Sequence, residues 1–489
     1  MAAHIEIPDF DVIIVGAGIS GINFAYRMQE SNPELSYCIL EARHEIGGTW
    51  SLFQYPGIRS DSDLYTFGFA WRPWRGKHSI VHGSIIRQYL EDSATQEGID
   101  RRIRFCHKVN KLNWSSSSDM WTFDITTQDT EMMSLRSRFV FLGTGYYDYQ
   151  EPLRADIPGI HNFKGKVVHP QFWPGELDYT NKRVVVIGSG ATAITLLPSL
   201  TTRAAHVTML QRSPTYIASL PSQGAFETIV SKILPCFAAN RVIRFKWMLF
   251  SFFMVSICRL FPRASKFFLL RETAKLLPPD FNLEPDFVPS YNPWEQRLCF
   301  CPDGDFYACI RSGKGSVNTG TIETITASSV KLTSGRELHP DIIVTATGLK
   351  LCTAGGITVT IDGEPYAISN HFAWRAAMVE GLPNLVLSWG YVDASWTLGA
   401  DSTAQLACRL LTQMRKESVS VIVPRMMAEE RQTLEERPFL SLKATYVKKG
   451  GNAFPKAASA GPWQPRSYFW RDLAIARWGD IKGGLEWLK

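Results

Sequence analysis

Three glycines near the N-terminus have the spacing that binds the pyrophosphate of a dinucleotide. The motif Gly16-x-Gly18-x-x-Gly21 follows the apolar run 11–15, which is typical of a buried strand. The first glycine permits a tight turn, the second lets the backbone approach the phosphates, and the third lets the next helix pack closely. Glu41 ends the following strand, where a carboxylate can bind the ribose hydroxyls of FAD or NAD. A solvated charge at a strand end is the alternative role for Glu41.

The same pattern occurs a second time with a different ending. Gly188-x-Gly190-x-x-Ala193 follows the apolar run 183–187, and the next strand ends at a glutamine and Arg212, with no acid. A guanidinium can pair with a 2′-phosphate, so this half favours NADPH. A solvated charge is again the alternative for Arg212.

Two similar glycine motifs predict an α/β fold with two Rossmann-like dinucleotide-binding domains and a helical insertion in the second. Each unit closes with an apolar strand that runs into glycines, at 139–145 and at 341–348. The expected boundaries are 1–150 for the first part of an FAD-binding domain, 151–214 for a linker and the first part of an NADPH-binding domain, 215–290 for the insertion, 291–350 for the second part of the NADPH-binding domain, and 351–489 for the second part of the FAD-binding domain and the C-terminal region.

The composition is that of a folded protein and excludes several other classes. Of 489 residues, 45% are hydrophobic and 20% are charged, which excludes a largely disordered chain. The net charge is +6, and no basic block or nucleic-acid-binding motif stands out, so no nucleic-acid partner is expected. Nine cysteines without paired spacing predict reduced thiols and no metal site. With no signal segment visible, we expect a cytoplasmic protein.

The insertion at 215–290 is rich in aromatic and aliphatic residues and has a helical pattern over 228–260 and 266–277. Its apolar run 247–258 is flanked by basic residues on both sides and is too short to cross a bilayer. Either this helix is buried, or it lies in a membrane interface. Peripheral membrane association through 241–266 is therefore a second expectation beside the cytoplasmic one.

The segment after Glu41 distinguishes between classes of flavoprotein. It has no cysteine pair, which excludes the disulfide reductases. Instead, residues 47–61 read G-G-T-W-x4-Y-P-G-x3-D, and residues 163–174 read F-x-G-x3-H-x3-W-P. Both match, without a departure, the two fingerprints of the Baeyer–Villiger monooxygenases. The chain thus resembles the class B flavoprotein monooxygenases of this type. Segments 55–63, 291–297, 394–398 and 436–439 are similar to the ethionamide-activating subgroup.

The resemblance implies a reaction. NADPH reduces FAD, the reduced flavin traps O₂ as a C4a-peroxyflavin, and one oxygen atom is inserted beside the carbonyl of a ketone to give an ester or lactone. The aromatic insertion favours a hydrophobic ketone. Oxygenation of sulfur or nitrogen in a thio- or amine compound, as in flavin-containing monooxygenases, is the alternative activity. A flavin protein that senses NADP or only releases peroxide is an alternative of another class.

The resemblance also implies residue roles. Arg297 matches the active-site arginine, whose permanent charge stabilises a peroxide anion, and Asp61 matches the carboxylate that positions it. A structural ion pair for Arg297, a turn or cap for Asp61 and simple packing for Trp50 are the alternatives. His169 is expected in a hinge between the domains, with direct chemistry or a purely structural role as alternatives.

The remaining expected contacts divide between the two cofactors. Those expected near FAD are Gly16, Gly18, Ser20, Gly21, Glu41, Thr49, Trp50, Ser51, Leu52, Arg59, Ser60, Asp61 and Val109. Those expected near NADPH are Gly188, Ser189, Gly190, Ala191, Thr192, Ala193, Ile194, Arg212 and Ser213.

Overall fold

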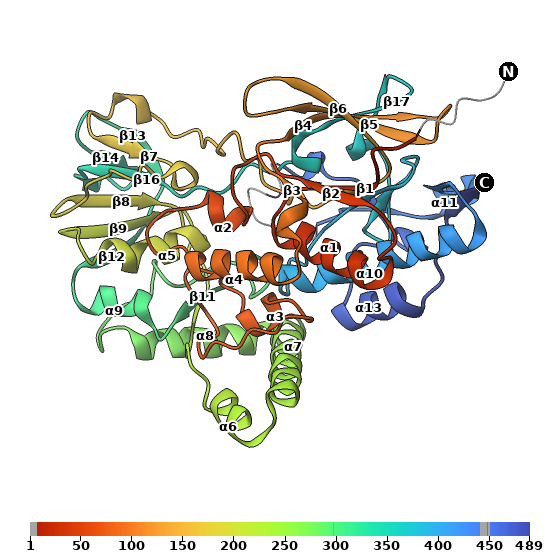
Figure 1. Cartoon of the computed structure of the whole chain (residues 1–489). Helices are drawn as coiled ribbons and strands as arrows, with labels where there is room; N and C mark the ends of the chain where they lie inside the picture. The colour runs from red at the N-terminus through yellow and green to blue at the C-terminus, as the bar shows by residue number, and fades with distance from the viewer. Residues whose placement is uncertain (1–6, 297, 441–446, 448–449) are drawn as a thin grey trace.

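The computed structural model describes the whole chain except residues 1–6, 297, 441–446 and 448–449. Two sheets lie side by side, and the helices of the insertion project from one side of the molecule (Figure 1). This arrangement confirms the predicted α/β fold with two glycine-turn units.

The first sheet has nine strands, taken from both halves of the chain. Its parallel part places β1 (Phe10–Val15) between β2 (Tyr37–Leu40) and β6 (Met132–Leu142). The middle of β1 is fully buried, as expected of a parallel strand that is covered on both faces. The other strands are β3 (Ile103–Arg104), β4 (Lys108–Ser115), β5 (Met120–Thr126), β17 (Thr358–Ile361), β18 (Glu364–Pro365) and β21 (Leu385–Leu387).

Helices pack on this sheet through apolar faces. Helix α1 (Ile19–Ser31) begins at the first glycine turn and packs against α10 (Trp396–Glu417), which in turn packs against α13 (Phe469–Trp478). Helix α4 (Gly83–Gln96) also contacts α1. The first glycine turn, where FAD is expected, thus lies among helices from distant parts of the sequence.

The second sheet is entirely parallel, in the order β12-β9-β8-β16-β7. Its strands are β7 (Lys166–Val168), β8 (Arg183–Ile187), β9 (His206–Gln211), β12 (Gly315–Thr319) and β16 (Ile342–Thr345). Helix α5 (Ala191–Leu200) begins at the second glycine turn, and α9 (Asp305–Arg311) packs beside it. A three-stranded antiparallel sheet is formed by β13 (Ile322–Ile325), β14 (Val330–Leu332) and β15 (Glu337–Leu338).

The chain crosses between the two sheets twice, and the two crossings lie against each other. Tyr147 forms a bridge with Leu351. The backbone N–H of Asp148 donates to the carbonyl of Lys350 over 2.8 Å. The Lys350 ammonium lies 2.9 Å from the Asp148 carboxylate. Because the crossings are joined, the halves are connected by one paired strap instead of two independent tethers.

The insertion forms three helices: α6 (Ala225–Ile233), α7 (Cys236–Leu260) and α8 (Pro262–Leu276). The expected single helix over 228–260 is therefore wrong in one respect, because it breaks before Pro235. Proline disfavours helical geometry in the residue before it, and Leu234 is extended. Within the described residues no single helix is long and apolar enough to span a membrane; α7 and α8, bent by 115°, satisfy that test only as a pair.

Short elements complete the fold. They are α2 (Thr49–Leu52), α3 (Leu64–Phe67), α11 (Ala428–Thr433), β10 (Ile217–Leu220), β11 (Cys299–Pro302), β19 (Ala373–Trp374), β20 (Met378–Val379), β22 (Val421–Pro424), β23 (Glu436–Arg437), β24 (Ala457–Ala458) and β25 (Leu485–Leu488). All nine cysteines, each within the described part of the chain, carry free thiols.

Candidate active site

The first glycine turn has the geometry that its sequence predicts. Gly16 adopts a φ of +102°, and a Cβ there would lie 2.8 Å from the carbonyl oxygen of Gly143. A Cβ on Gly21 would lie 1.9 Å from the carbonyl oxygen of Gly16, so only glycine fits. Gly18 caps α1 and lies close to the backbone of Gly48. The turn therefore presents the N-terminus of α1 in a narrow, glycine-lined cradle suited to a pyrophosphate.

Glu41 lies directly beside this turn and is only 6% exposed, so it is not a solvated charge. Its carboxylate accepts the backbone N–H of Ala17 at 2.7 Å and that of Arg43 at 2.9 Å. Burial raises the pKa of the Glu41 carboxyl, and these N–H donors oppose the rise. Val109 is buried in β4, and the buried Ser20 hydroxyl accepts the indole N–H of Trp396 at 3.0 Å.

The segment that carries the first fingerprint folds over the same turn. Thr49, Trp50, Ser51 and Leu52 form the short helix α2. The Thr49 hydroxyl lies 3.2 Å from the phenol of Tyr149, and the Ser51 hydroxyl donates to the carbonyl of Gly48. Trp50 packs against the cores of both halves, so its packing role and a place near the flavin are compatible.

Arg59 joins the two halves. Its guanidinium pairs through both terminal nitrogens with the carboxylate of Asp305 on α9, and its side chain is 12% exposed. Sequence reasoning missed Asp305, because it lies 246 positions away and belongs to no motif. Ser60, next to Arg59, is buried and bonds to Ser62.

Asp61 lines a cavity between the halves and the insertion, which measures about 610 Å³ when its solvent-open part is included. The other lining residues are mainly apolar or aromatic: Ser62, Asp63, Ile80, Leu220, Trp247, Phe250, Ser251, Met254, Trp294, Leu298, Phe300, Val392, Asp393, Ala394 and Ser395. Arg297 lies outside the described residues. Trp294 and Leu298, which flank it in the sequence, line the same cavity as Asp61.

The neighbouring acid, Asp63, has a different task from Asp61. It caps α3, accepting the backbone N–H of Thr66 at 2.8 Å and the hydroxyl of Thr66 at 2.6 Å. Burial raises the pKa of the Asp63 carboxyl. The cap role considered for Asp61 thus belongs to Asp63, and Asp61 is placed at the cavity wall.

The second glycine turn has the same backbone shape in a more open setting. Gly188 has a φ of +140°, and a Cβ there would lie 2.1 Å from the carbonyl oxygen of Ala346. Gly190 is exposed, and no atom of the described residues lies within 4 Å of a Cβ built there. Arg212 is exposed after β9. Of the other expected contacts, Ser189, Ala191, Thr192 and Ser213 are half-buried, and Ala193 and Ile194 are buried in α5.

His169, from the second fingerprint, lies at the crossings and not among the residues that line the cavity. Its Nδ1 accepts the backbone N–H of Gln171 at 3.2 Å, and the Gln171 amide donates to the carbonyl of Asp148 at 2.7 Å. Burial lowers the pKa of the His169 imidazole. This placement favours the expected hinge role over direct chemistry.

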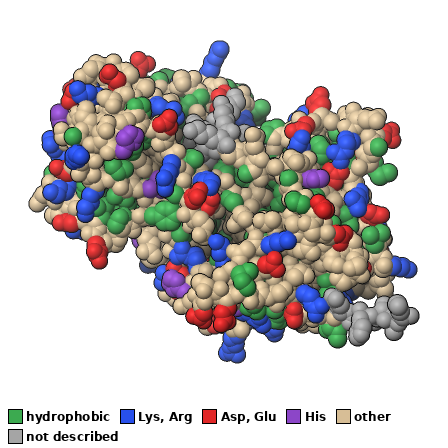
Figure 2. Space-filling model, turned by 90° about the horizontal axis from the view of Figure 1, so that it is seen from above, with side chains coloured by type: hydrophobic (Ala, Val, Ile, Leu, Met, Phe, Trp, Pro, Cys, Tyr) green, Lys and Arg blue, Asp and Glu red, His purple; other side chains and the backbone are tan. Residues whose placement is uncertain are grey.

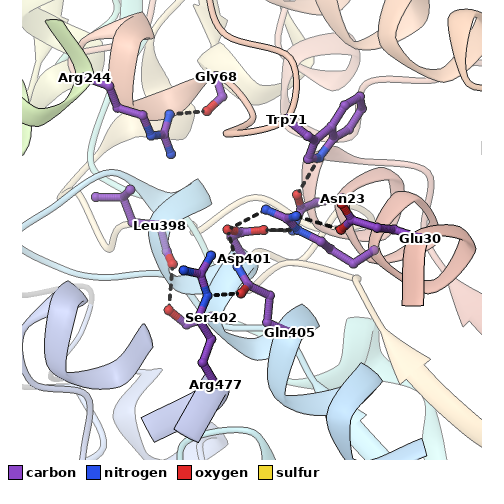
Figure 3. Close-up of polar contacts among 11 residues, drawn as sticks. Asn23, Glu30, Gly68, Trp71, Arg244, Leu398, Asp401, Ser402, Gln405 and Arg477 are labelled. Carbon is purple, nitrogen blue, oxygen red and sulfur yellow. Dashed lines mark hydrogen bonds and ion pairs between the residues drawn. The ribbon is translucent and has the colours of Figure 1, made fainter. Parts of the chain in front are cut away.

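A buried polar network fixes the helices beside the site. Asp401 on α10 accepts the amide N–H of Asn23 on α1 (Figure 3). It also accepts the guanidinium of Arg27, on the same helix. The indole of Trp71 donates to Asn23 at 3.0 Å. Sequence reasoning gave no signal for this network, because its members are joined only by the packing of α1 against α10.

Two sheets, two glycine turns and an intervening cavity define a flavoprotein oxidoreductase of the two-dinucleotide type. The family model for pyridine nucleotide-disulphide oxidoreductases matches residues 13–223. The chain is 44% identical over 481 residues to the FAD-containing monooxygenase EthA of Mycobacterium tuberculosis, covering 98% of both chains. It is 41% identical to EthA of Mycolicibacterium smegmatis over 96% of this chain and 95% of that one. The chain therefore belongs to the family of FAD-containing monooxygenases.

Solved structures share the fold at lower identity. OTEMO in complex with FAD and NADP superposes with a TM-score of 0.75 at 18% identity, covering 99% of this chain and 100% of that one. Cyclohexanone monooxygenase from Rhodococcus sp. Phi1, bound to NADP⁺, gives 0.74 at 18% identity over 98% and 99% of the two chains. The fold and the monooxygenase class expected from the sequence are confirmed.

Proposed function

We propose that this enzyme uses FAD, NADPH and O₂ to insert one oxygen atom beside the carbonyl of a hydrophobic ketone. The balanced reaction is ketone + O₂ + NADPH + H⁺ → ester or lactone + H₂O + NADP⁺. The observation that carries the proposal is the largely apolar pocket at Asp61, the residue that closes the intact first fingerprint.

The first turn supports FAD as the resident cofactor. Gly16 and Gly21 leave no room for side chains, and the N-terminus of α1 is free to hold a pyrophosphate. The buried Glu41 carboxylate lies at the end of the second strand, where it would bind the ribose hydroxyls. Thr49, Trp50 and Ser51 would line the flavin ring, and the bound flavin supplies oxygen activation.

The second turn supports NADPH as the exchanging reductant. Gly190 and Thr192 at the N-terminus of α5 are accessible to a pyrophosphate, and the exposed Arg212 is free to reach a 2′-phosphate. Since Arg212 has no acidic neighbour in the sequence motif, we propose a preference for NADPH over NADH.

We propose two tasks for the residues around the cavity: to limit the access of water and to supply a positive charge. Trp247, Phe250 and Met254 form an apolar wall that would limit the access of water to the reacting carbonyl from this side. We propose that Arg297 supplies the fixed positive charge there, and that Asp61 orients the Arg297 guanidinium.

We also propose the five-part division of the chain stated above. The first sheet draws strands from both 10–142 and 358–387, which supports a discontinuous FAD-binding domain. Because the Gln171 amide ties the second fingerprint to the paired crossings, we propose that His169 and its neighbours guide movement between the domains.

An isotope experiment tests the reaction. The FAD-loaded enzyme is supplied with NADPH, ¹⁸O₂ and an alkyl ketone, and the products are analysed by mass spectrometry. We expect an ester that carries one ¹⁸O atom. A thioether is offered in parallel; if it gives a sulfoxide while no ketone reacts, sulfur oxygenation replaces the ketone reaction. If all O₂ that is consumed appears as H₂O₂ with either compound, the enzyme is not an oxygenase for them.

A further inference from the structure

Helices α6, α7 and α8 carry an unusual amount of exposed apolar surface. Ile233 and Leu260 are each 72% exposed, and Phe267 is 69% exposed. The exposed members of this surface are Phe226, Ile229, Ile233, Phe237, Val242, Phe245, Phe253, Ile257, Leu260, Phe261, Phe267 and Phe268. They come from one stretch of sequence, and α6 and the first part of α7 project away from both sheets (Figure 1). Clustered apolar exposure of this kind marks an interaction surface.

Helix α7 is apolar on two opposite sides. Phe237, Phe245, Phe253 and Ile257 are each more than half exposed and mark the broad outer side of the helix. The other side contributes buried core at Ile243 and the wall of the cavity at Trp247, Phe250 and Met254. A single helix, about 10 Å across, thus separates the cavity from the outer surface.

Polar anchors fix which side of α7 faces outward. The guanidinium of Arg244 donates to the carbonyl of Gly68 at 2.8 Å (Figure 3). It also donates to the carbonyl of Tyr65 at 2.8 Å. The Lys246 ammonium and the Trp247 indole both bind the buried Glu227 carboxylate, at 2.8 and 2.7 Å. Because these groups hold the inner side, the outward phenylalanines cannot turn into the protein.

The insertion carries a strong excess of positive charge. Residues 225–277 contain nine Lys and Arg against two Asp and Glu, so they carry 9 − 2 = +7, and the rest of the chain carries 6 − 7 = −1. Lys232, Arg241, Arg263 and Arg271 make no ion pair with the described residues, and Arg241 lies 3.9 Å over the ring of Phe237. On the face opposite the projecting helices, by contrast, acidic and basic side chains are interspersed (Figure 2).

We infer that the outer surface of α6–α8 docks peripherally on a bilayer with anionic headgroups, and that the enzyme takes its ketone from this bilayer. Exposed aromatic rings beside unpaired basic side chains fit the boundary between headgroups and acyl chains. A second copy of the chain does not fit, since it would bring +7 against +7. The docking on lipid does not depend on the proposed function. The substrate class, a ketone that partitions into membranes, rests on it.

Vesicle flotation tests the docking. The FAD-loaded full-length enzyme should float with phosphatidylglycerol–phosphatidylcholine vesicles at low salt, and weakly with phosphatidylcholine alone. The variant Lys232→Gln/Arg241→Gln should bind about 25-fold more weakly, since each basic residue near the surface contributes about fivefold. Phe245→Ser/Phe253→Ser should also lose binding. Met132→Ser, a substitution of an equally exposed apolar residue outside the insertion, is the matched control and should bind as wild type.

Two outcomes would overturn the docking. One is an absence of binding to anionic vesicles at low salt. The other is self-association of the lipid-free protein, seen by sedimentation velocity, that the Phe245→Ser/Phe253→Ser variant abolishes, because a second copy would then be the occupant. All substitutions are at exposed positions, and retained FAD absorbance and an unchanged melting temperature verify that each variant is folded.

Kinetics test the origin of the substrate. Phe245→Ser/Phe253→Ser should oxidise a short, water-soluble ketone at the wild-type rate and a long-chain ketone held in anionic vesicles at least about tenfold more slowly. Equal rates on the vesicle-held ketone would refute delivery from the bilayer. If the wild-type enzyme converts neither ketone, the proposed function fails, while flotation still reports on docking by itself.

Discussion

The two glycine turns have nearly the same backbone and opposite surroundings. Gly48 lies against the first turn and the indole of Trp396 binds Ser20 within it, whereas the position of Gly190 in the second turn is open. The acid beside the first turn is buried, and the arginine beside the second is exposed. A shared motif thus occurs in an enclosed and in an open setting, which suits the resident FAD and the exchanging NADPH that we propose.

The largest test of this comparison substitutes one glycine in each turn. Gly21→Ala places a Cβ against the Gly16 carbonyl, so we expect loss of FAD and destabilisation by about 3 kcal/mol or more. Gly190→Ala meets open space and should change stability by less than about 0.5 kcal/mol. Flavin absorbance and thermal unfolding measure both variants. Equal losses in the two variants would show that the turns are equally enclosed.

The next effect concerns the proposed catalytic charge near Asp61. Arg297→Ala should lower the rate of ester formation by about 10²–10³-fold, since the fixed charge that we propose for Arg297 is lost. Reduction of the flavin by NADPH should continue, which stopped-flow absorbance measures separately. Arg297→Lys, which keeps a charge but not the planar fork, should recover part of the rate. Ester formation at the wild-type rate in Arg297→Ala would remove this arginine from the active site.

A smaller effect is expected at the open turn. Arg212→Ala should raise KM for NADPH about tenfold and leave KM for NADH unchanged, because only NADPH has the 2′-phosphate. Lys182→Ala, at another exposed basic residue of the same half, is the control. Initial rates with each nucleotide give the ratio of KM for NADH to KM for NADPH. If Arg212→Ala leaves this ratio unchanged, the contact to the 2′-phosphate lies elsewhere.

The smallest effect tests the crossings that join the two turns. Burial lowers the pKa of His169, so the folded protein favours the neutral imidazole. Its contribution to stability is therefore complete above the ordinary pKa of about 6.5 and is lost as the pH falls below it. His169→Gln should lose less stability than wild type between about pH 7 and 5 in urea unfolding. If the free energy of unfolding falls equally with pH in both proteins, the pKa of His169 is the same in the folded and unfolded states.

The strands and glycine turns could be predicted from the sequence because they depend on near neighbours. The strand at 183–187 has the expected bounds, and β2 ends directly before Glu41. Positive φ at Gly16 and Gly188 follows from the tight turn that each motif requires. The two fingerprints likewise identified the monooxygenase class before any contact was known. The end of helix α7 at Leu260 was predicted correctly, whereas the break at Pro235 and the start of α8 at Pro262 were missed.

Only the tertiary structure decided which motif is enclosed and which is open. The contact between Ser20 and Trp396 spans 376 positions, and the pairing of Arg59 with Asp305 spans 246. The same is true of α7, whose apolar pattern is compatible with either side being buried until Arg244 and Lys246 fix its orientation. The sequence by itself determined the turns, the cofactor class and the enzyme family, because each rests on local backbone geometry. Burial, the cavity and the outward surface depend on contacts between distant segments, which exist only once the chain has folded.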